Sequence, residues 1–126
     1  MNTKPITELH EEHQEWLNKI AFYADDILVM RKRLEEIASK NTGKEILAEV
    51  EHFQNQFILQ KENIDELHHA LKDHENYLEN RVDENPTASD HRKENDHTKM
   101  RERMSGFEKI VNDLRHEFNN FLSKTM

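Results

Sequence analysis

Apolar residues recur through the first third of the chain in alternating steps of three and four. This spacing is the heptad pattern of a helix that buries one stripe of its surface. It continues until Asn41-Thr42-Gly43 interrupts it, and so predicts a helix over residues 5–40. The positions in the stripe are Ile6, Leu9, His13, Trp16, Ile20, Tyr23, Ile27, Met30, Leu34 and Ile37.

The same spacing appears twice more, and it predicts helices over residues 43–84 and 87–124. The second stripe contains Ile46, Val50, Phe53, Phe57, Gln60, Ile64, Leu67, Leu71, His74 and Leu78. The third contains His97, Met100, Met104, Phe107, Val111, Leu114, Phe118 and Phe121.

Strong helix breakers lie only between these stretches. Thr42 and Glu45 form a predicted capping box at the start of the second helix. Asn85-Pro86 makes the other break, because proline fits a first helical turn but cannot continue a helix. Short connections force adjacent helices to run antiparallel. We therefore expect an all-α fold of one domain, residues 1–126: an antiparallel, up-down-up bundle of three long helices with a coiled-coil-like heptad core.

Composition removes several functional classes from consideration. The formal net charge of −8 disfavours nucleic-acid binding and binding to anionic membranes. The absence of cysteine excludes disulfides and thiolate chemistry. No apolar run is long enough for a signal peptide or a membrane span. We expect a cytoplasmic protein with no nucleic-acid or membrane partner.

The nine histidines are the unusual feature of the composition. Three of them, His13, His74 and His97, occupy stripe positions where apolar residues are expected. Antiparallel pairing places all three in one layer, at the end of the bundle that holds the second break. His10 precedes His13 by one turn, and Glu94 precedes His97 in the same way.

Imidazole nitrogens together with a carboxylate suit a divalent transition metal, and zinc or iron fits best. The predicted metal ligands are His10, His13, His74, Glu94 and His97. If the three stripe histidines bind one ion, their nearest ring nitrogens should lie roughly 4 Å or less apart.

An alternative is that the histidine layer holds no metal and is only a hydrated polar end of the bundle. The histidines outside the stripes are expected on solvated surfaces: His52, His68, His69 and His116. Gln60, which is polar but lies in a stripe, is expected to fix the register of the helices.

No catalytic motif is present, so the first functional hypothesis is a non-enzymatic metal-binding bundle. The alternative is a dimeric helical interaction module with an unmetallated polar end. A third hypothesis is a metalloenzyme in which an open coordination position beside Glu12, Glu75 or Glu94 activates water. Some apolar residues outside the stripes predict a homodimer interface on the first two helices: Phe22, Val29, Ile58 and Leu59.

Overall fold

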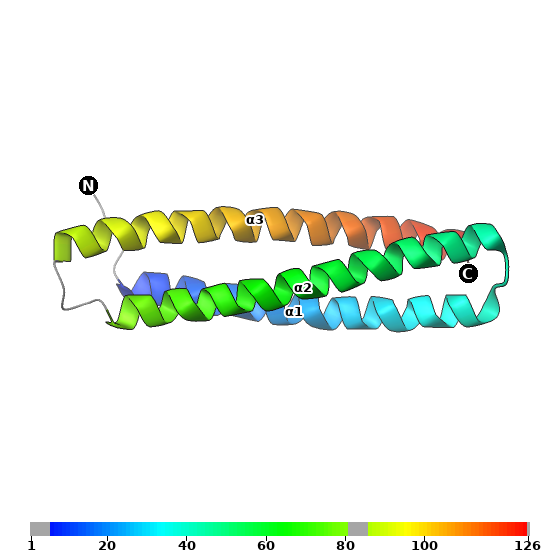
Figure 1. Ribbon diagram of the computed structural model, residues 1–126, viewed down its shortest axis with the longest axis horizontal. Coiled ribbons are helices and arrows are strands. Elements are labelled where there is room, and N and C mark those ends of the chain that lie inside the picture. Colours follow the sequence, from blue (N-terminus) through cyan, green and yellow to red (C-terminus); the bar gives the residue numbers. More distant parts are fainter. Residues whose placement is uncertain (1–5, 81–85, 126) are drawn as a thin grey trace.

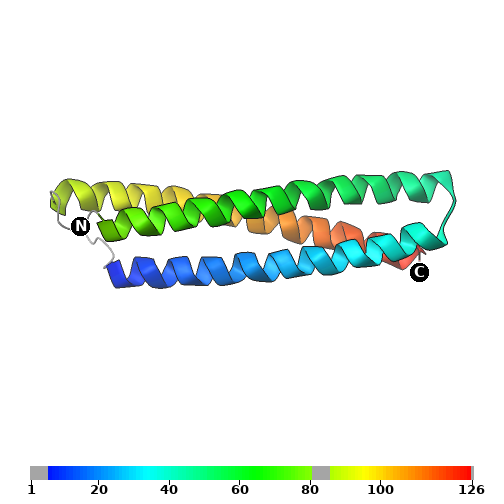
Figure 2. The same cartoon turned by 60° about the horizontal axis from the view of Figure 1, so that its bottom comes forward.

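The computed structural model contains three long helices and confirms the predicted all-α class. It describes residues 6–80 and 86–125, with side chains described for 9–74 and 97–125. The helices are α1 (Ile6–Lys40), α2 (Lys44–Asn80) and α3 (Pro86–Thr125), and the described residues contain no strand. They lie side by side along one long axis in both views (Figures 1 and 2). α2 runs opposite to α1 and α3, so the start of α1 lies beside the end of α2 and the start of α3 (Figure 1).

The connection between α1 and α2 is only three residues long. The Asn41 side chain closes α1 by donating a hydrogen bond from Nδ2 to the Ile37 carbonyl, at 2.8 Å. α2 starts with a hydrogen bond from the Leu47 amide to the Gly43 carbonyl, at 3.0 Å. Because the N-cap carbonyl accepts the first bond of a helix, Gly43 is the N-cap. The expected capping box at Thr42 is therefore wrong by one residue.

The third helix starts at a proline. α3 begins at Pro86, where the lack of an amide proton costs no helical hydrogen bond. The described part of α2 ends at Asn80, and its predicted extension to Glu84 lies outside the described residues.

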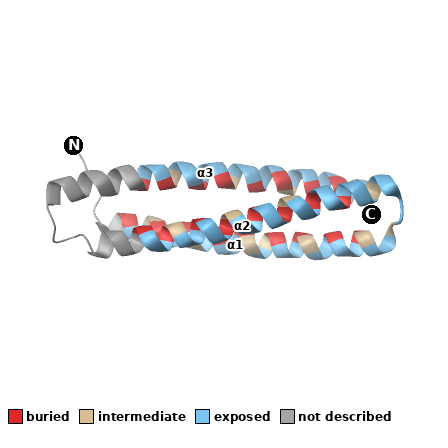
Figure 3. Ribbon diagram, in the orientation of Figure 1, coloured by how far each residue is buried: buried red, intermediate tan, exposed pale blue. Residues whose placement is uncertain are grey.

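The predicted stripes form the core. Among the residues whose burial is described, every stripe position is buried except Ile46, which is half-buried. The buried positions follow the inner sides of the three helices (Figure 3). Phe53, Phe57, Phe118 and Phe121 pack together, with ring centroids 5.1 to 6.2 Å apart. The core around these four rings is apolar, whereas the three buried histidines lie toward the other end of the bundle.

Among the described side chains, three pairs of an arginine or lysine with a carboxylate join α1 to α3 at intervals of seven residues along both helices. Arg101 pairs with Glu12, with 3.0 Å between Nη2 and Oε1. Lys19 pairs with Glu108 at 3.3 Å, and Arg115 donates from Nε to Oδ2 of Asp26 at 2.7 Å. The charge on α1 alternates along the row, negative, positive, negative. A shift of α3 by seven residues along α1 would place like charges opposite one another. The row of ion pairs therefore favours the observed register of α3 against α1.

Candidate metal centre

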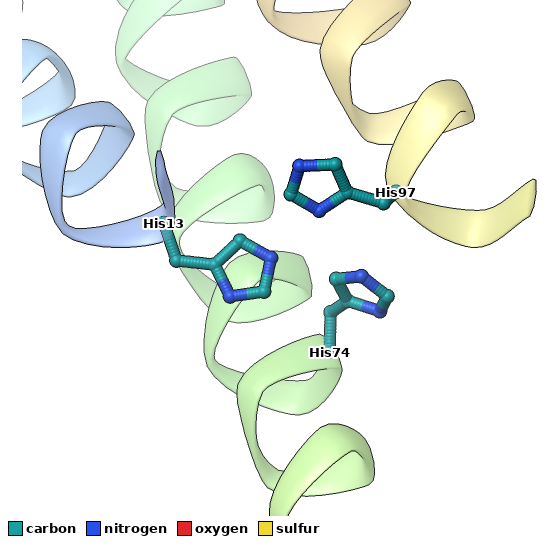
Figure 4. A group of neighbouring side chains, drawn as sticks. All are labelled: His13, His74 and His97. Atoms are coloured by element: carbon teal, nitrogen blue, oxygen red, sulfur yellow. The ribbon is translucent and has the colours of Figure 1, made fainter. Parts of the chain in front are cut away.

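Three imidazole rings meet inside the bundle, one from each helix. His13 extends from α1, His74 from α2 and His97 from α3, and the rings face one another (Figure 4). Their centroids lie 4.8, 5.1 and 6.0 Å apart. One ligand nitrogen from each residue can be chosen so that all three lie within 4.8 Å of one another.

All three histidines are buried. The exposed fraction is 0% for His13, 9% for His74 and 2% for His97. They occupy stripe positions, so the same periodicity that buries leucine and phenylalanine elsewhere brings these polar rings inside. The predicted convergence of three helices on one histidine layer is confirmed.

The spacing of the rings is somewhat wider than that of a closed coordination shell. Nitrogens about 2.0–2.1 Å from a tetrahedral zinc ion are about 3.3 Å apart, so the rings must approach by roughly 1.5 Å at most. The upper limit of 4.8 Å also exceeds the roughly 4 Å expected from the sequence.

A carboxylate–arginine pair flanks the layer. Oε1 of Glu12 lies 2.5 Å from Nε2 of His97. Arg101 donates to both oxygens of the same carboxylate, from Nη2 at 3.0 Å and from Nε at 3.1 Å. Such bidentate pairing is among the stronger charge-assisted contacts in proteins. Glu12 therefore has a fixed orientation, with one oxygen directed at the His97 ring.

This network shifts the protonation equilibria of its members. Burial alone would raise the pKa of Glu12, but the hydrogen bonds from Arg101 and His97 outweigh it and lower the pKa to about 2. Burial lowers the pKa of His97, although the neighbouring Glu12 carboxylate opposes that shift. The hydrogen bond to Glu12 raises the pKa of Arg101. The layer thus combines an ionised carboxylate with a His97 ring that favours its neutral, metal-binding form.

Trp16 closes the layer on the side of the apolar core. Its ring stacks on His97 at a centroid distance of 4.9 Å and an interplanar angle of 27°. It also contacts His13, at 5.6 Å. Trp16 is the only tryptophan in the chain, so its fluorescence reports on this layer alone.

Two predicted ligands are not part of the observed cluster. His10 is exposed and does not belong to it, so its assignment as a ligand is not supported. A separation of three residues turns a side chain about 60° around the helix, which is enough to leave the buried stripe. Glu94 lies in α3, but its side chain lies outside the described residues.

The remaining histidines with described side chains lie where they were expected. His52, His68, His69 and His116 are all exposed. They provide natural controls for the buried three.

Sequence reasoning missed the role of Glu12 and Arg101. The sequence predicted Glu12 only as a possible neighbour of an open coordination position, and it did not single out Arg101. A signal was present, because Glu12 precedes one buried histidine and Arg101 follows another by one turn. Similar charged residues border the stripes elsewhere, so the pattern did not single these two out.

The described cluster supplies three nitrogen ligands. Zinc sites with four protein ligands are structural, whereas three ligands leave one position for water or another donor.

Comparison with known proteins assigns no family: no family model matches the chain, and no curated protein or solved structure is significantly similar to it. Within residues 6–80 and 86–125, no helix has the length and apolar character needed to cross a membrane.

Proposed function

We propose that this protein binds one divalent transition-metal ion, zinc or iron, through His13, His74 and His97, and that it does so without catalysing a reaction. The convergence of three buried imidazoles from three helices carries this proposal. Imidazole nitrogen is a good ligand for both metals. Metal storage, metal sensing and stabilisation of the bundle are the roles that such a site fits.

Binding at this site is coupled to folding. The three ligands are separated by 61 and 23 residues in the chain, from 74 − 13 and 97 − 74. They meet only when all three helices are packed, so the ion binds the folded state preferentially. Metal at 100 times its dissociation constant would then stabilise the fold by about 2.7 kcal/mol.

The test uses untagged protein, because a histidine tag would bind metal itself. Elemental analysis of the purified protein gives the metal and its stoichiometry, for which we expect about one ion per chain. Titration of the metal-free protein with Zn²⁺ and with Co²⁺, followed by Trp16 fluorescence and melting temperature, gives the affinity. Both signals should saturate, and a chelator should reverse them.

A matched pair of variants identifies the site. His74→Ala should abolish the metal response, whereas His116→Ala should retain it because His116 is exposed and remote from the cluster. Equal loss of binding in both variants, or a wild-type protein with no metal-dependent stabilisation, would refute the proposal.

A homodimeric interaction module is the second candidate function. Phe22, Val29, Ile58 and Leu59 are exposed by 59, 52, 41 and 46%, respectively. Arg115 of α3 lies over the Phe22 ring, 5.7 Å from its centroid, so an interface that covers Phe22 would extend to the edge of α3. Burial of these residues in a twofold dimer through α1 and α2 would remove apolar surface from water.

Sedimentation analysis tests the dimer. The wild-type protein should sediment as a dimer at micromolar concentration, and Phe22→Glu with Leu59→Glu should sediment as a monomer. A monomeric wild-type protein would rule out this interface, with no consequence for the metal site.

A further inference from the structure

We infer that Glu12, anchored by Arg101, is a positioning residue that holds His97 in the tautomer whose Nδ1 atom binds the metal. This inference rests on the proposed metal site. It assigns a role to two residues that are not themselves ligands, and it specifies which nitrogen of His97 coordinates.

The direction of one hydrogen bond determines the tautomer. An ionised carboxylate only accepts hydrogen bonds, so at 2.5 Å from Glu12 Oε1 the Nε2 atom of His97 must carry a proton. A neutral imidazole has one N–H, and its other nitrogen keeps a lone pair. In His97 that other nitrogen is Nδ1, which is buried and has no hydrogen-bond partner among the described residues. The Nδ1 atom of His97 therefore carries the lone pair that can bind a metal ion.

Arg101 fixes the carboxylate that imposes this choice. Its two donors contact the two oxygens of Glu12, so the carboxylate cannot rotate without breaking a bond. Oε1 contacts both Arg101 and His97. Trp16 stacks on the His97 ring and restricts its tilt. The proton position is thus set and the tilt of the ring restricted before an ion arrives, which is how outer-shell carboxylates support metal-binding histidines.

Glu12 also couples the positions of two ligands, His13 and His97. Glu12 directly precedes His13, so one turn of α1 supplies a ligand and the residue that orients a ligand on α3. A displacement of α3 relative to α1 would disturb both.

The other ion pairs between α1 and α3 provide the matched control. Asp26 and Arg115 lie fourteen residues further along their helices, from 26 − 12 and 115 − 101, and also join α1 to α3. Among the described residues, no histidine forms a hydrogen bond or an ion pair with Asp26 or Arg115. A purely structural role for Glu12 predicts that Glu12→Ala and Asp26→Ala behave alike, whereas a positioning role predicts that only Glu12→Ala affects the metal site.

The decisive measurement is nitrogen NMR of the histidine rings in metal-free, ¹⁵N-labelled full-length protein. His97 should carry its proton on Nε2 in the wild-type protein and in Asp26→Ala. Glu12→Ala should populate the Nδ1-protonated tautomer, and Glu12→Gln should largely restore the wild-type pattern because its amide oxygen still accepts from Nε2. A wild-type His97 protonated on Nδ1 would overturn the inference.

Zinc titration supplies the second readout. Glu12→Ala should weaken zinc binding by roughly 10- to 100-fold, the range for loss of an outer-shell partner, and Asp26→Ala should bind like the wild type. Wild-type affinity in Glu12→Ala would overturn the positioning role and leave the metal site standing. A wild-type protein that binds neither zinc nor ferrous iron would instead overturn the proposed function itself.

Discussion

Replacement of all three layer histidines by leucine should raise the stability of the metal-free protein while abolishing its response to metal. Leucine is close to histidine in volume, so His13→Leu, His74→Leu and His97→Leu together fill the layer without large repacking. Removing all three rings at once leaves no imidazole facing an apolar neighbour. Buried polar groups that are replaced together by apolar groups of similar shape often yield a neutral or stabilised protein.

The burial of the layer sets the size of the effect. The three side chains are exposed by only 0, 9 and 2%, so each leucine would be almost fully buried. Burying a leucine side chain contributes about 1.5–3 kcal/mol to the free energy of unfolding. The imidazole that it replaces is itself partly apolar, so the net gain at each position is about 1–2 kcal/mol. Three positions give about 3–6 kcal/mol, and loss of the His97–Glu12 hydrogen bond subtracts about 1–2 kcal/mol. The expected net gain is about 1–5 kcal/mol, or roughly 4–19 °C in melting temperature for a domain of this size.

Urea unfolding and thermal melting of metal-free proteins test this expectation. Gln60→Leu is the matched control, because Gln60 is another polar stripe residue and is only 2% exposed. It should leave the zinc response intact. A triple variant less stable than the metal-free wild type would refute the reasoning, since it would show that the histidines stabilise the bundle through their own hydrogen bonds.

Three further outcomes are expected. The pKa values of Glu12 and His97 are both lowered in the folded state, so the folded protein binds fewer protons than the unfolded chain and its stability falls on acidification. Urea midpoints of metal-free protein should decline below pH 6.5 through His97 and again between pH 4.5 and about 2 through Glu12, and Glu12→Gln should flatten the lower decline. Gly106→Ala should stabilise the protein by about 0.5–1 kcal/mol in urea unfolding, with unchanged zinc affinity, because an added Cβ meets nothing within 4 Å in the interior of α3. Lys19→Glu should destabilise the bundle and Glu108→Lys in the same chain should recover the loss, with a coupling of about 0.2–1 kcal/mol in a double-mutant cycle; independent effects would show that this pair does not interact.

The sequence alone determined the helices and which residues they bury. Periodic burial is a property of a single helix, because side chains three and four residues apart share a face wherever the helix packs. Rare breakers then fixed the connections to within a few residues. The convergence of His13, His74 and His97 followed from the same logic, since short connections leave little freedom in the level at which stripe residues meet.

Only the tertiary structure decided which residues surround the layer. His10 and Glu12 lie on the same turn as His13, and the sequence gives both a ligand-type side chain. In the folded bundle His10 is exposed, whereas Glu12 contacts His97 and Arg101 on α3. That difference depends on how α1 is rotated against its neighbours, and at the edge of a stripe a rotation of some tens of degrees moves a side chain from solvent to an interface. The partners of charged residues therefore follow from helix rotation and register, which a repeating pattern within one helix does not encode.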